Sequence, residues 1–304
     1  MKIVVTGATG LVGKVLSQLI LSRGDQLIVF SRDPKSAGNT IAGAQAYVEW
    51  DYKKPTEWYK HLNGADAVIH LAGQSLFGNL ASDSYKKEIL ETRVHSTENF
   101  LSAFQKCDIK PGAFISASAI GYYGATNLDE VAFTEDDERG AGFLSEVCAE
   151  WEEAASRAQD FGIRTVSVRV GIVLDKYEGA LEKLLLPFNL YLGGNIGEGN
   201  QWLSWIHKKD TADIFLHALD KHDLTGPINA VAPTPVRMKE FTDLIAKKLN
   251  KPVLIKIPES PLRALMGDAS LPVTEGIKVF PKRALESGFR FRFNTIEEAL
   301  DNLM

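Results

Sequence analysis

The order of apolar and polar positions divides the first thirty residues into strand, turn, helix and strand. Residues 3–5 are a β-branched run, which predicts a short strand buried on both faces. Apolar residues recur at helical spacing over residues 15–20, which predicts a helix that begins inside the glycine-rich stretch 6–13. The apolar run at residues 26–30 predicts a second strand. The first unit of the chain is therefore a strand that passes through a glycine turn into a helix.

Strands and helices continue to alternate as far as about residue 175. This order predicts right-handed crossover connections and a mostly parallel sheet. A strand at residues 66–71 is apolar enough to be buried on both faces, as in a sheet covered by helices on each side. Further strands are predicted over residues 46–50, 114–117 and 163–170, and helices over residues 53–62, 86–106 and 143–161.

The second part of the chain has a different character, because glycines gather at residues 193–199 and prolines interrupt the C-terminal stretch. We expect an α/β fold: a Rossmann-like doubly wound parallel sheet over residues 1–175, completed by segments near 210–235. The remaining residues, 176–209 and 236–304, are expected to form a smaller C-terminal α/β lobe for the substrate. In this second part of the chain, helices are predicted over residues 210–220, 239–249 and 295–303, and strands over residues 228–231 and 253–257.

The glycine turn after the first strand is a candidate phosphate site. Gly7, Gly10 and Gly13 let the backbone turn tightly and approach a pyrophosphate closely. The unpaired N–H groups of the first helical turn point toward such a ligand, and the helix dipole favours its negative charge. An ordinary strand-to-helix turn is the alternative. The strand before the glycines and the helix after them favour a dinucleotide cofactor.

The end of the second strand favours NADP(H) over NAD(H). Enzymes that prefer NAD place an acidic residue about 20 residues beyond the glycines, where it binds the ribose 2′-hydroxyl. This chain has Ser31 and Arg32 there. A carboxylate would repel a 2′-phosphate, whereas a hydroxyl and a guanidinium bind it. The alternative for Arg32 is a solvated arginine in a loop.

Three later strands also end in residues that suit a ligand. Asp51 follows the third strand and could accept a hydrogen bond from an adenine amino group, although it equally suits a turn or a helix cap. Small residues at 72–74 follow the fourth strand and allow the backbone to approach a cofactor. Ser118 ends the fifth, central strand, and open α/β sheets bind ligands at this edge.

Composition narrows the functional classes. The 304 residues carry a net charge of −5, which does not favour a nucleic-acid or anionic-membrane partner. Two cysteines, Cys107 and Cys148, do not form a disulfide framework and suit the reducing cytoplasm. No apolar run reaches the ~20 residues of a membrane span, and the N-terminal strand leaves no room for a signal peptide. We expect a cytoplasmic protein with a small-molecule substrate, as a monomer or homodimer.

Several motifs resemble one known family. Residues 6–13 (TGATGLVG), 70–73 (HLAG) and 116–118 (SAS) are similar to those of extended short-chain dehydrogenases/reductases, in the NAD(P)-dependent epimerase/dehydratase superfamily. Over essentially its whole length the chain closely resembles the "epimerase family protein" branch, which has its own C-terminal tail domain. The further motifs that carry this likeness are Ser31-Arg32, residues 118–124 (SAIGYYG), Trp151-Glu152, residues 169–171 (RVG), residues 205–207 (WIH), Asn229, Pro233, Gly267, Pro281 and Gly288-Phe289.

The resemblance implies a set of cofactor contacts and a catalytic serine. Ser118 stands where the superfamily places the serine that hydrogen-bonds the reacting oxygen. The implied contacts to NADP(H) are Gly7, Thr9, Gly10, Leu11, Val12, Ser31, Arg32, Asp51, Leu71, Ala72, Gly73, Gln74, Arg93 and Ala117, of which Arg93 stands where many relatives have asparagine.

The chain departs from the family pattern at its acid/base pair. The superfamily normally pairs a catalytic tyrosine with a lysine four residues later, whose positive charge lowers the pKa of the tyrosine. Residues 142–150 (GFLSEVCAE) contain neither a tyrosine nor a lysine. We expect Phe143 or Leu144 to occupy the place of the tyrosine. A phenylalanine or leucine cannot transfer a proton.

Other residues could supply the missing acid/base group. Tyr122 and Tyr123 lie close to Ser118 in sequence, and either would need a nearby cation such as Arg93 to act at neutral pH. The alternative is that both tyrosines only line and pack the pocket. His207 is a second candidate because imidazole titrates near neutrality, and its alternative is a structural histidine. No cluster of residues has the spacing of metal ligands.

Two functions of different classes remain open. The first is an NADP(H)-binding, epimerase- or oxidoreductase-like enzyme that acts on a small polar substrate such as a nucleotide sugar. The cofactor would then supply the hydride chemistry. The second is a non-catalytic NADP(H)-binding protein that signals redox state to a partner. The missing tyrosine–lysine pair favours the second, and the polar and aromatic residues at 122–123 and 201–207 favour the first.

Overall fold

A computed structural model describes residues 1–53, 57–75, 82–124, 130–253, 255–258 and 275–304. The strands are β1 (Lys2–Thr6), β2 (Gln26–Ser31), β3 (Ala46–Glu49), β4 (Ala67–His70), β5 (Ala113–Ala119), β6 (Arg164–Val170), β7 (Ile172–Leu174), β8 (Gly194–Ile196), β9 (Trp202–Leu203), β10 (Trp205–His207), β11 (Gly226–Ala230), β12 (Val236–Arg237) and β13 (Ile255–Ile257).

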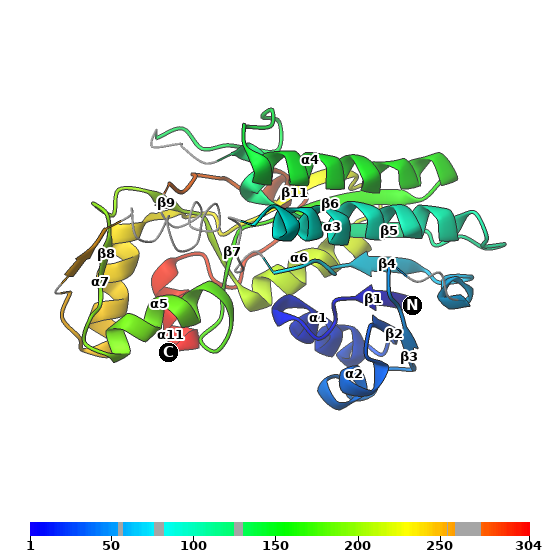
Figure 1. Cartoon of the computed structure of the whole chain (residues 1–304), viewed down its shortest axis with the longest axis horizontal. Helices are drawn as coiled ribbons and strands as arrows, with labels where there is room; N and C mark the ends of the chain where they lie inside the picture. Colours follow the sequence, from blue (N-terminus) through cyan, green and yellow to red (C-terminus); the bar gives the residue numbers. More distant parts are fainter. Residues whose placement is uncertain (54–56, 76–81, 125–129, 254, 259–274) are drawn as a thin grey trace.

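Helices connect most of these strands, and Figure 1 shows their arrangement. The α-helices are α1 (Leu11–Ser22), α2 (Pro34–Thr40), α3 (Asp83–Phe104), α4 (Phe143–Ser156), α5 (Gly179–Asn189), α6 (Lys208–Asp220), α7 (Met238–Leu249), α10 (Lys282–Glu286) and α11 (Ile296–Leu303). Three short 3₁₀ helices are η1 (Glu57–His61), η2 (Ile120–Tyr123) and η3 (Arg157–Phe161).

A seven-stranded sheet forms the centre of the molecule, in the order β11-β6-β5-β4-β1-β2-β3. Every pairing in it is parallel, with Val4 opposite Ile28 on one side and Val68 on the other. The strand order reverses between β1 and β4, so this is a doubly wound sheet whose ligand crevice lies at that reversal. The predicted Rossmann-like α/β class is confirmed.

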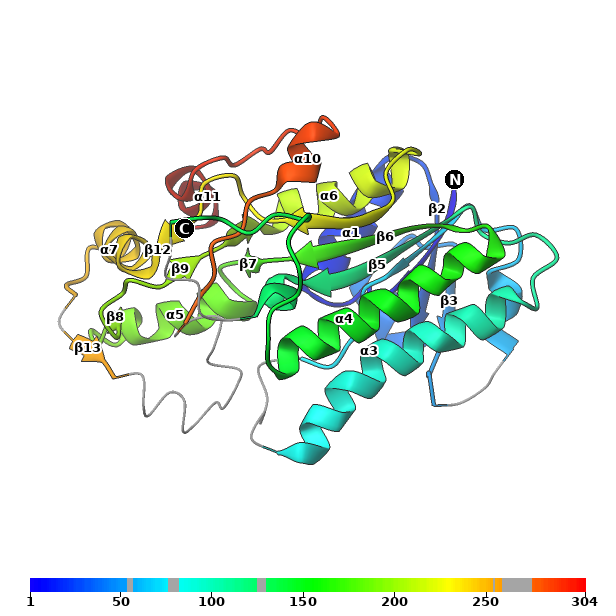
Figure 2. The same ribbon diagram turned by 90° about the horizontal axis from the view of Figure 1, so that it is seen from above.

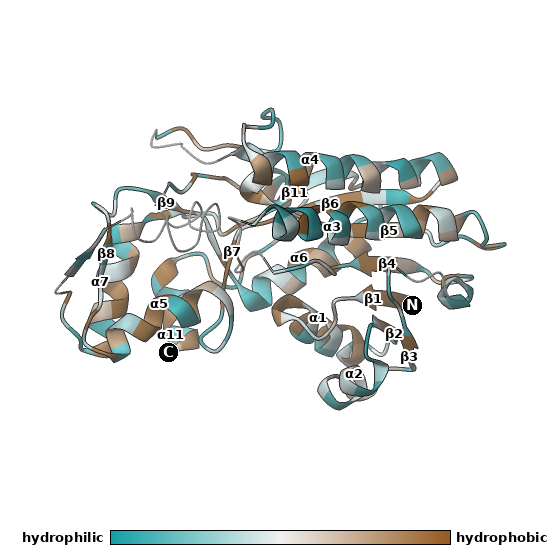
Figure 3. Ribbon diagram, viewed as in Figure 1, coloured by the Kyte–Doolittle hydropathy of each residue, from teal (hydrophilic) through white to brown (hydrophobic). Residues whose placement is uncertain are grey.

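Helices cover both faces of this sheet, as Figure 2 shows. On one face α1 and α6 lie side by side, and residues such as Leu16 and Phe215 pack on Val5 and Ile115. On the other face α3 and α4 lie side by side, with Phe100 among the residues over Val4 and Phe114. Figure 3 shows the hydrophobic strands of the sheet between helices that carry hydrophilic residues along much of their length.

A smaller lobe extends from the carboxyl end of the sheet (Figure 1). Its core joins α5, α7 and α11 to the short strands β9 and β10, with Leu181, Trp205, Phe241 and Leu300 buried among them. Ile277 returns from the C-terminal stretch to pack beside Ile120 and Tyr123 near the end of β5. The expected boundaries at 175 and 236 stay predictions, and the segment expected to complete the sheet contributes the edge strand β11.

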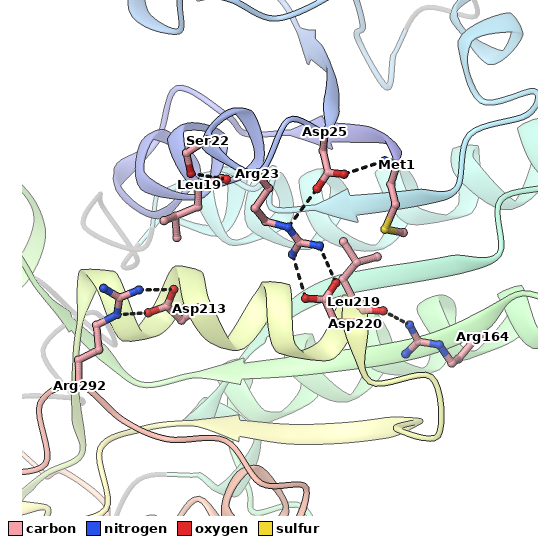
Figure 4. A network of polar contacts seen from close by, with 10 residues as sticks. All are labelled: Met1, Leu19, Ser22, Arg23, Asp25, Arg164, Asp213, Leu219, Asp220 and Arg292. Atoms are coloured by element: carbon pink, nitrogen blue, oxygen red, sulfur yellow. Dashed lines mark hydrogen bonds and ion pairs between the residues drawn. The ribbon is translucent and has the colours of Figure 1, made fainter.

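Figure 4 shows polar contacts of α1 and α6, the two helices that cover one face of the sheet. Arg23 makes two contacts of 2.9 Å with Asp220, which link the end of α1 to the end of α6. Arg292, from the C-terminal stretch, pairs with Asp213 on α6 at 2.5 and 3.1 Å. Arg164 donates to the carbonyl of Leu219 at 2.8 Å. Helix α6 is thus tied to the N-terminal unit, to the sheet and to the tail.

A buried carboxylate fixes the tail more firmly than these surface pairs do. Asp210, on α6, is fully buried and accepts the backbone N–H groups of Arg292 and Phe293 at 2.9 and 3.1 Å. Burial raises the pKa of Asp210 to about 6, although the two amide hydrogen bonds oppose the shift. A buried acceptor must be hydrogen-bonded, so α6 depends on the tail for the partners of this side chain.

The elements agree with the sequence pattern except where they are short or interrupted. The helix predicted over residues 143–161 is α4 followed by η3, and the one predicted over residues 86–106 begins three residues earlier, at Asp83. Part of the helix predicted over residues 53–62 lies outside the described residues, and the rest is η1. The strand predicted over residues 253–257 is β13. The sequence analysis missed α2, α5, α10 and the short strands β7, β8, β9, β10 and β12, whose segments are too short or too mixed to show a period.

We predict that Gly13→Ala destabilises the fold. A Cβ at Gly13 would lie 2.1 Å from the carbonyl oxygen of Gly7 and 2.7 Å from the backbone of Ala8, so strand and helix must separate. Such overpacking costs about 1–3 kcal/mol, which urea denaturation measures. The control is Gln18→Ala, at an exposed position of α1, which should change the free energy of unfolding by less than about 0.5 kcal/mol. Equal urea midpoints for Gly13→Ala and wild type would contradict the predicted clash.

Candidate functional site: a cofactor cleft and an apolar cavity

A cleft of about 280 Å³ lies at the carboxyl ends of β1, β2 and β4. It contains nine of the residues that the sequence analysis assigned to the cofactor, and it brings together segments far apart in the chain. Those nine are Gly7, Thr9, Gly10, Ser31, Arg32, Leu71, Ala72, Gly73 and Gln74. The lining also includes Ala8, Val29, Phe30, Trp50, Tyr52 and Thr92, which the sequence analysis did not assign.

The glycine turn has the close contacts that a phosphate-binding loop requires. Gly7 has φ +68°, and a Cβ there would lie 2.9 Å from the backbone nitrogen of Ala72. Gly10 is the N-cap of α1 and provides no side-chain cap, and the first turn of α1 contains no acidic residue. The N–H groups of this turn are therefore available to an anion in a cradle that has no space for side chains. The geometry fits the pyrophosphate of a dinucleotide.

A buried hydrogen-bond chain holds the end of β4 against this turn. Thr6 Oγ1 accepts the N–H groups of Leu71 and Ala72, each at 3.1 Å, and donates to His70 Nδ1 at 2.8 Å. His70 Nε2 then donates to Ser96 Oγ at 2.9 Å, and Ser96 donates to a carbonyl of α3. Burial, aided by the charge of Arg93, lowers the pKa of His70 to about 3, so the ring is neutral. The residues that line the cleft are thus fixed before any ligand binds.

The end of β2 turns a guanidinium toward the cleft and a carboxylate away from it. Ser31 and Arg32 both line the cleft, and Arg32 is exposed. Asp33 is the nearest acidic residue, but its side chain caps α2 by accepting the N–H of Ser36 at 2.9 Å. The only charged side chain in the described lining is therefore positive. This arrangement suits a ribose 2′-phosphate and does not suit a free 2′-hydroxyl as well.

Five of the assigned cofactor residues do not line the cleft. Leu11 and Val12 begin α1, and Ala117 packs against the core under α6. The carboxylate of Asp51 accepts the N–H of Lys53 at 2.9 Å, as the turn-forming alternative predicted. Arg93 lies behind Gly73, with its Cζ 3.1 Å from a Cβ built at that glycine. Trp50 and Tyr52, beside Asp51 in sequence, contribute to the lining where an acidic contact was expected.

A second cavity, of about 140 Å³, lies at the N-terminus of α4. Its walls come from the end of β5, from the start of α4 and from the second lobe, and they are mostly apolar. The residues that line it are Ile120, Gly121, Gly124, Ala141, Gly142, Phe143, Leu144, Ser145, Ile172, Trp202, Ser204, Gly276 and Ile277.

Both hydroxyls in the lining of this cavity already have protein partners. Ser145 donates to the carbonyl oxygens of Tyr122 and Gly140 at 2.8 and 2.7 Å. Ser204 donates to the carbonyl of Ile277 at 2.7 Å and accepts a backbone N–H at 2.9 Å. Because these groups are satisfied, the described lining favours an apolar group of a ligand.

Ser118 faces a buried ion pair. Its hydroxyl donates to Glu152 Oε1 at 2.6 Å, and Ser118 itself is 3% exposed. Glu152 also accepts two hydrogen bonds of 2.8 Å from the guanidinium of Arg169. Arg169 is a buried residue of β6. Burial acts to lower the pKa of Arg169, but the hydrogen bonds and the charge of Glu152 raise it overall. The sequence analysis noted both charged residues as family motifs and gave them no role, because nothing in the sequence pairs them.

The same guanidinium organises the two tyrosines. Arg169 donates to the hydroxyl of Tyr123 at 2.9 Å, and that hydroxyl donates to Asn229 at 2.8 Å. Burial raises the pKa of Tyr123 well above its ordinary value, although Arg169 opposes the shift. Tyr123 is 3% exposed and therefore packs the site, as its alternative predicted. The ring of Tyr122 lies 3.5 Å from the Arg169 guanidinium and remains half-buried.

Three parts of the catalytic hypothesis need correction. The cation beside the tyrosines is Arg169, because Arg93 instead lies over the ring of Trp151 at 5.3 Å. His207 is fully buried, caps α6 through the N–H of Lys209, and stacks on a ring of the tail. Burial lowers the pKa of His207 to about 4, so the ring is neutral, and its cap and stacking contacts favour the structural alternative. Tyr123 has the buried role described above, and no part of Ser118, Tyr122 or Tyr123 lines the apolar cavity.

Two further properties concern the described residues as a whole. Among them, no three histidine, cysteine, aspartate or glutamate side chains are grouped as metal ligands would be. In the same residues, no helix combines the length and the apolar character that crossing a membrane requires.

The fold and the cleft define a Rossmann-like α/β protein with a glycine-lined crevice at its strand reversal. The family model "NAD dependent epimerase/dehydratase family" matches residues 3–231, and a "domain of unknown function (DUF1731)" matches residues 257–303. The chain belongs to the NAD-dependent epimerase/dehydratase family, in its "epimerase family protein" branch with this C-terminal domain.

Relatives over the whole length of the chain carry the same description. Epimerase family protein YfhF of Bacillus subtilis is 37% identical, and the alignment covers 100% of this chain and 98% of that protein. Epimerase family protein SDR39U1 of Homo sapiens is 32% identical, with 100% of each chain covered.

A solved structure of this branch has the same fold. The crystal structure of human epimerase family protein SDR39U1 with NADPH superimposes with a TM-score of 0.85 at 30% identity, and covers 100% of this chain and 99% of that one. A nucleoside-diphosphate sugar epimerase from Corynebacterium glutamicum gives a TM-score of 0.79 at 31% identity, and covers 99% of this chain and 57% of that one.

We predict that the neutral state of His70 makes the fold sensitive to acid. The folded pKa of about 3 lies below the unfolded value near 6.5, so the stabilisation is complete above pH 6.5 and is lost as the pH falls toward 3. Between pH 7 and pH 5 the wild type should lose about 2 kcal/mol relative to His70→Gln, whose amide does not titrate. Urea denaturation across this pH range measures the difference. Parallel stability profiles for the two proteins would contradict it.

Proposed function

We propose that this protein binds NADP(H) in the cleft at the strand reversal and uses it for hydride exchange with a small substrate. The observation that carries the cofactor assignment is the end of β2, where Arg32 and Ser31 line the cleft while Asp33 caps α2. When bound, NADP(H) supplies the hydride chemistry. The NADPH named for the human relative supports the same cofactor.

Different residues would bind the pyrophosphate and the 2′-phosphate of this cofactor. The cradle at Gly7 and Gly10, with the first turn of α1, would hold the pyrophosphate. Arg32 and Ser31 would bind the 2′-phosphate. The Thr6–His70 chain keeps the end of β4 in place beside this turn, so little ordering of this wall is required on binding.

The apolar cavity is the proposed place for the substrate. It lies at the start of α4, where Phe143 and Leu144 stand in the region of the family's missing tyrosine. Typical ligand pockets have volumes of about 300–1,000 Å³, and this one has about 140 Å³. Its size and apolar lining favour a small carbonyl compound or alcohol over the nucleotide sugar that the sequence analysis suggested. The catalytic roles of Ser118 and Tyr122 stay predictions.

A second candidate is a protein that binds NADP(H) without turnover and signals its redox state to a partner. The specific observation in its favour is that Ser118 and Tyr123, the polar groups nearest the end of β5, are committed to a buried network. Such a network is fully hydrogen-bonded and does not exchange protons readily with a substrate.

We predict that Arg32→Ala weakens NADPH binding by about ten- to a hundredfold, which is the value of a hydrogen-bonded charge pair. NADH affinity should remain within twofold, because NADH has no 2′-phosphate. Titration calorimetry measures both cofactors. Lys35→Ala, which removes an exposed cation from the adjacent helix α2, is the matched control and should leave NADPH affinity nearly unchanged. Equal affinities of the wild type for NADPH and NADH would contradict the cofactor assignment.

We predict transfer of deuterium from NADPH labelled at nicotinamide C4 to a small ketone or aldehyde. The test set is a series of branched and aromatic carbonyl compounds, with the alcohol product examined by mass spectrometry. Leu144→Trp should fill the cavity and reduce transfer at least tenfold while NADPH affinity is kept. Ser118→Ala and Tyr122→Phe should each reduce turnover by about 10²–10⁴ if they assist proton transfer. Tight NADPH binding without transfer to any compound would favour the non-catalytic candidate.

A further inference from the structure

Arg93 is a cation for which the described part of the chain provides no carboxylate. It lies in the middle of α3 with its side chain half-buried. Among the described residues, the guanidinium of Arg93 makes one hydrogen bond, a long one from Nη1 to the carbonyl of Ile89 at 3.3 Å. Beyond that it makes a cation–π contact with Trp151 on α4, at 5.3 Å. Burial lowers the pKa of Arg93, which reflects the cost of this arrangement.

This guanidinium lines neither cavity, but it lies beside the cofactor cleft and packs on α4, whose first turn lines the apolar cavity. On one side it contacts Gly73, a residue of the cofactor cleft, and all three of its terminal atoms would be 3.1–3.4 Å from a Cβ there. On the other side it packs on Trp151 of α4, the helix that also carries the buried Cys148. The thiol of Cys148 is 3.7 Å from a Cβ built at Gly121, which lines the apolar cavity.

The other charged groups near the ligand sites already have partners. The buried guanidinium of Arg169 is neutralised by Glu152 through two hydrogen bonds of 2.8 Å. For the proposed cofactor, the turn at Gly7 and the side chain of Arg32 account for the pyrophosphate and the 2′-phosphate. A half-buried guanidinium without a counter-charge is unfavourable unless a ligand supplies one. The planar fork of arginine matches a carboxylate or a phosphate by two parallel hydrogen bonds.

We propose that Arg93 binds a carboxylate of the substrate, and that the substrate is a small organic acid with an apolar body. The apolar part would occupy the cavity beside Phe143 and Leu144, and the carboxylate would meet Arg93 next to Gly73. This inference rests on the proposed function, because it takes the apolar cavity as the substrate site. A phosphate of a larger ligand would use the same donors, and the experiment distinguishes the two.

The test compares carboxylates with their neutral amides on the NADPH-saturated protein. The probes are isovalerate against isovaleramide and benzoate against benzamide, followed by ligand-observed NMR at constant ionic strength. In the wild type at least one carboxylate should bind ten times more tightly than its amide. Arg93→Gln should reduce this preference to less than twofold, and Arg93→Lys should keep part of it. Arg157→Gln, which removes an exposed arginine paired with Glu98, is the control and should keep it all.

The outcomes separate this inference from the proposed function. Retained NADPH affinity in Arg93→Gln shows that the variant is folded and that Arg93 is not a phosphate ligand of the cofactor. A carboxylate preference that is absent in the wild type, or unchanged in Arg93→Gln, overturns the inference. If NADPH affinity falls more than tenfold in Arg93→Gln but is kept in Arg93→Lys, Arg93 binds a phosphate of the cofactor. That result also overturns the inference. The comparison of carboxylates with amides is repeated on the protein without NADPH. A protein that does not bind the cofactor is thereby distinguished from one that does not prefer carboxylates.

Discussion

The contact between the backbones of Gly7 and Gly13 is the constraint on which the rest of the structure depends. It sets the first helix against the turn before it, with no space for a side chain, and Gly7 in turn touches the backbone at the end of β4. Two neighbouring strands and one helix are therefore in close main-chain contact at this point. The hydroxyl of Thr6 and the ring of His70 satisfy the polar groups that this close packing buries. The position of the cleft follows from this packing, because its walls are the segments held together here.

A second centre lies at the end of β5, and it differs from the first in using charge. Arg169 and Glu152 form a bidentate pair below the surface, and Ser118, Tyr123 and Asn229 complete its hydrogen bonds. A buried pair of this kind stabilises a structure only when its remaining donors and acceptors are also satisfied. Ser118, which the family pattern suggests for chemistry, and Tyr123, a candidate through its closeness to Ser118 in sequence, serve that requirement here. Among the described residues, Arg93 is a half-buried cation without a carboxylate partner, and it lies beside Gly73 of the cofactor cleft.

The sequence predicted the sheet, the parallel direction of its strands and nine cleft residues. These depend on the local periodicity of apolar residues and on glycines that lie close together in the chain. Apart from β13, the sequence did not predict the short strands of the second lobe, whose two or three residues are too few to show a period. Nor did it pair Arg169 with Glu152, since such a contact joins a strand to a helix across the core. Asp51 and His207 illustrate a further limit. A carboxylate or an imidazole near a strand end looks the same in sequence whether it meets a ligand or caps its own backbone, and in both cases the backbone is its partner.

The buried carboxylate of Asp210 bears on how this chain divides into units. One family model ends at residue 231 and the other begins at residue 257, with Asp210 in the first and the amides of Arg292 and Phe293 in the second. A cut between them would remove both amide donors of Asp210, together with Phe289 and Phe291, which pack in the same core as Phe215 of α6. The border between the two family models is therefore not a border in the packing, because the tail completes the layer that covers α6. A chain shortened at this border would have to satisfy Asp210 with water and leave apolar residues of α6 exposed.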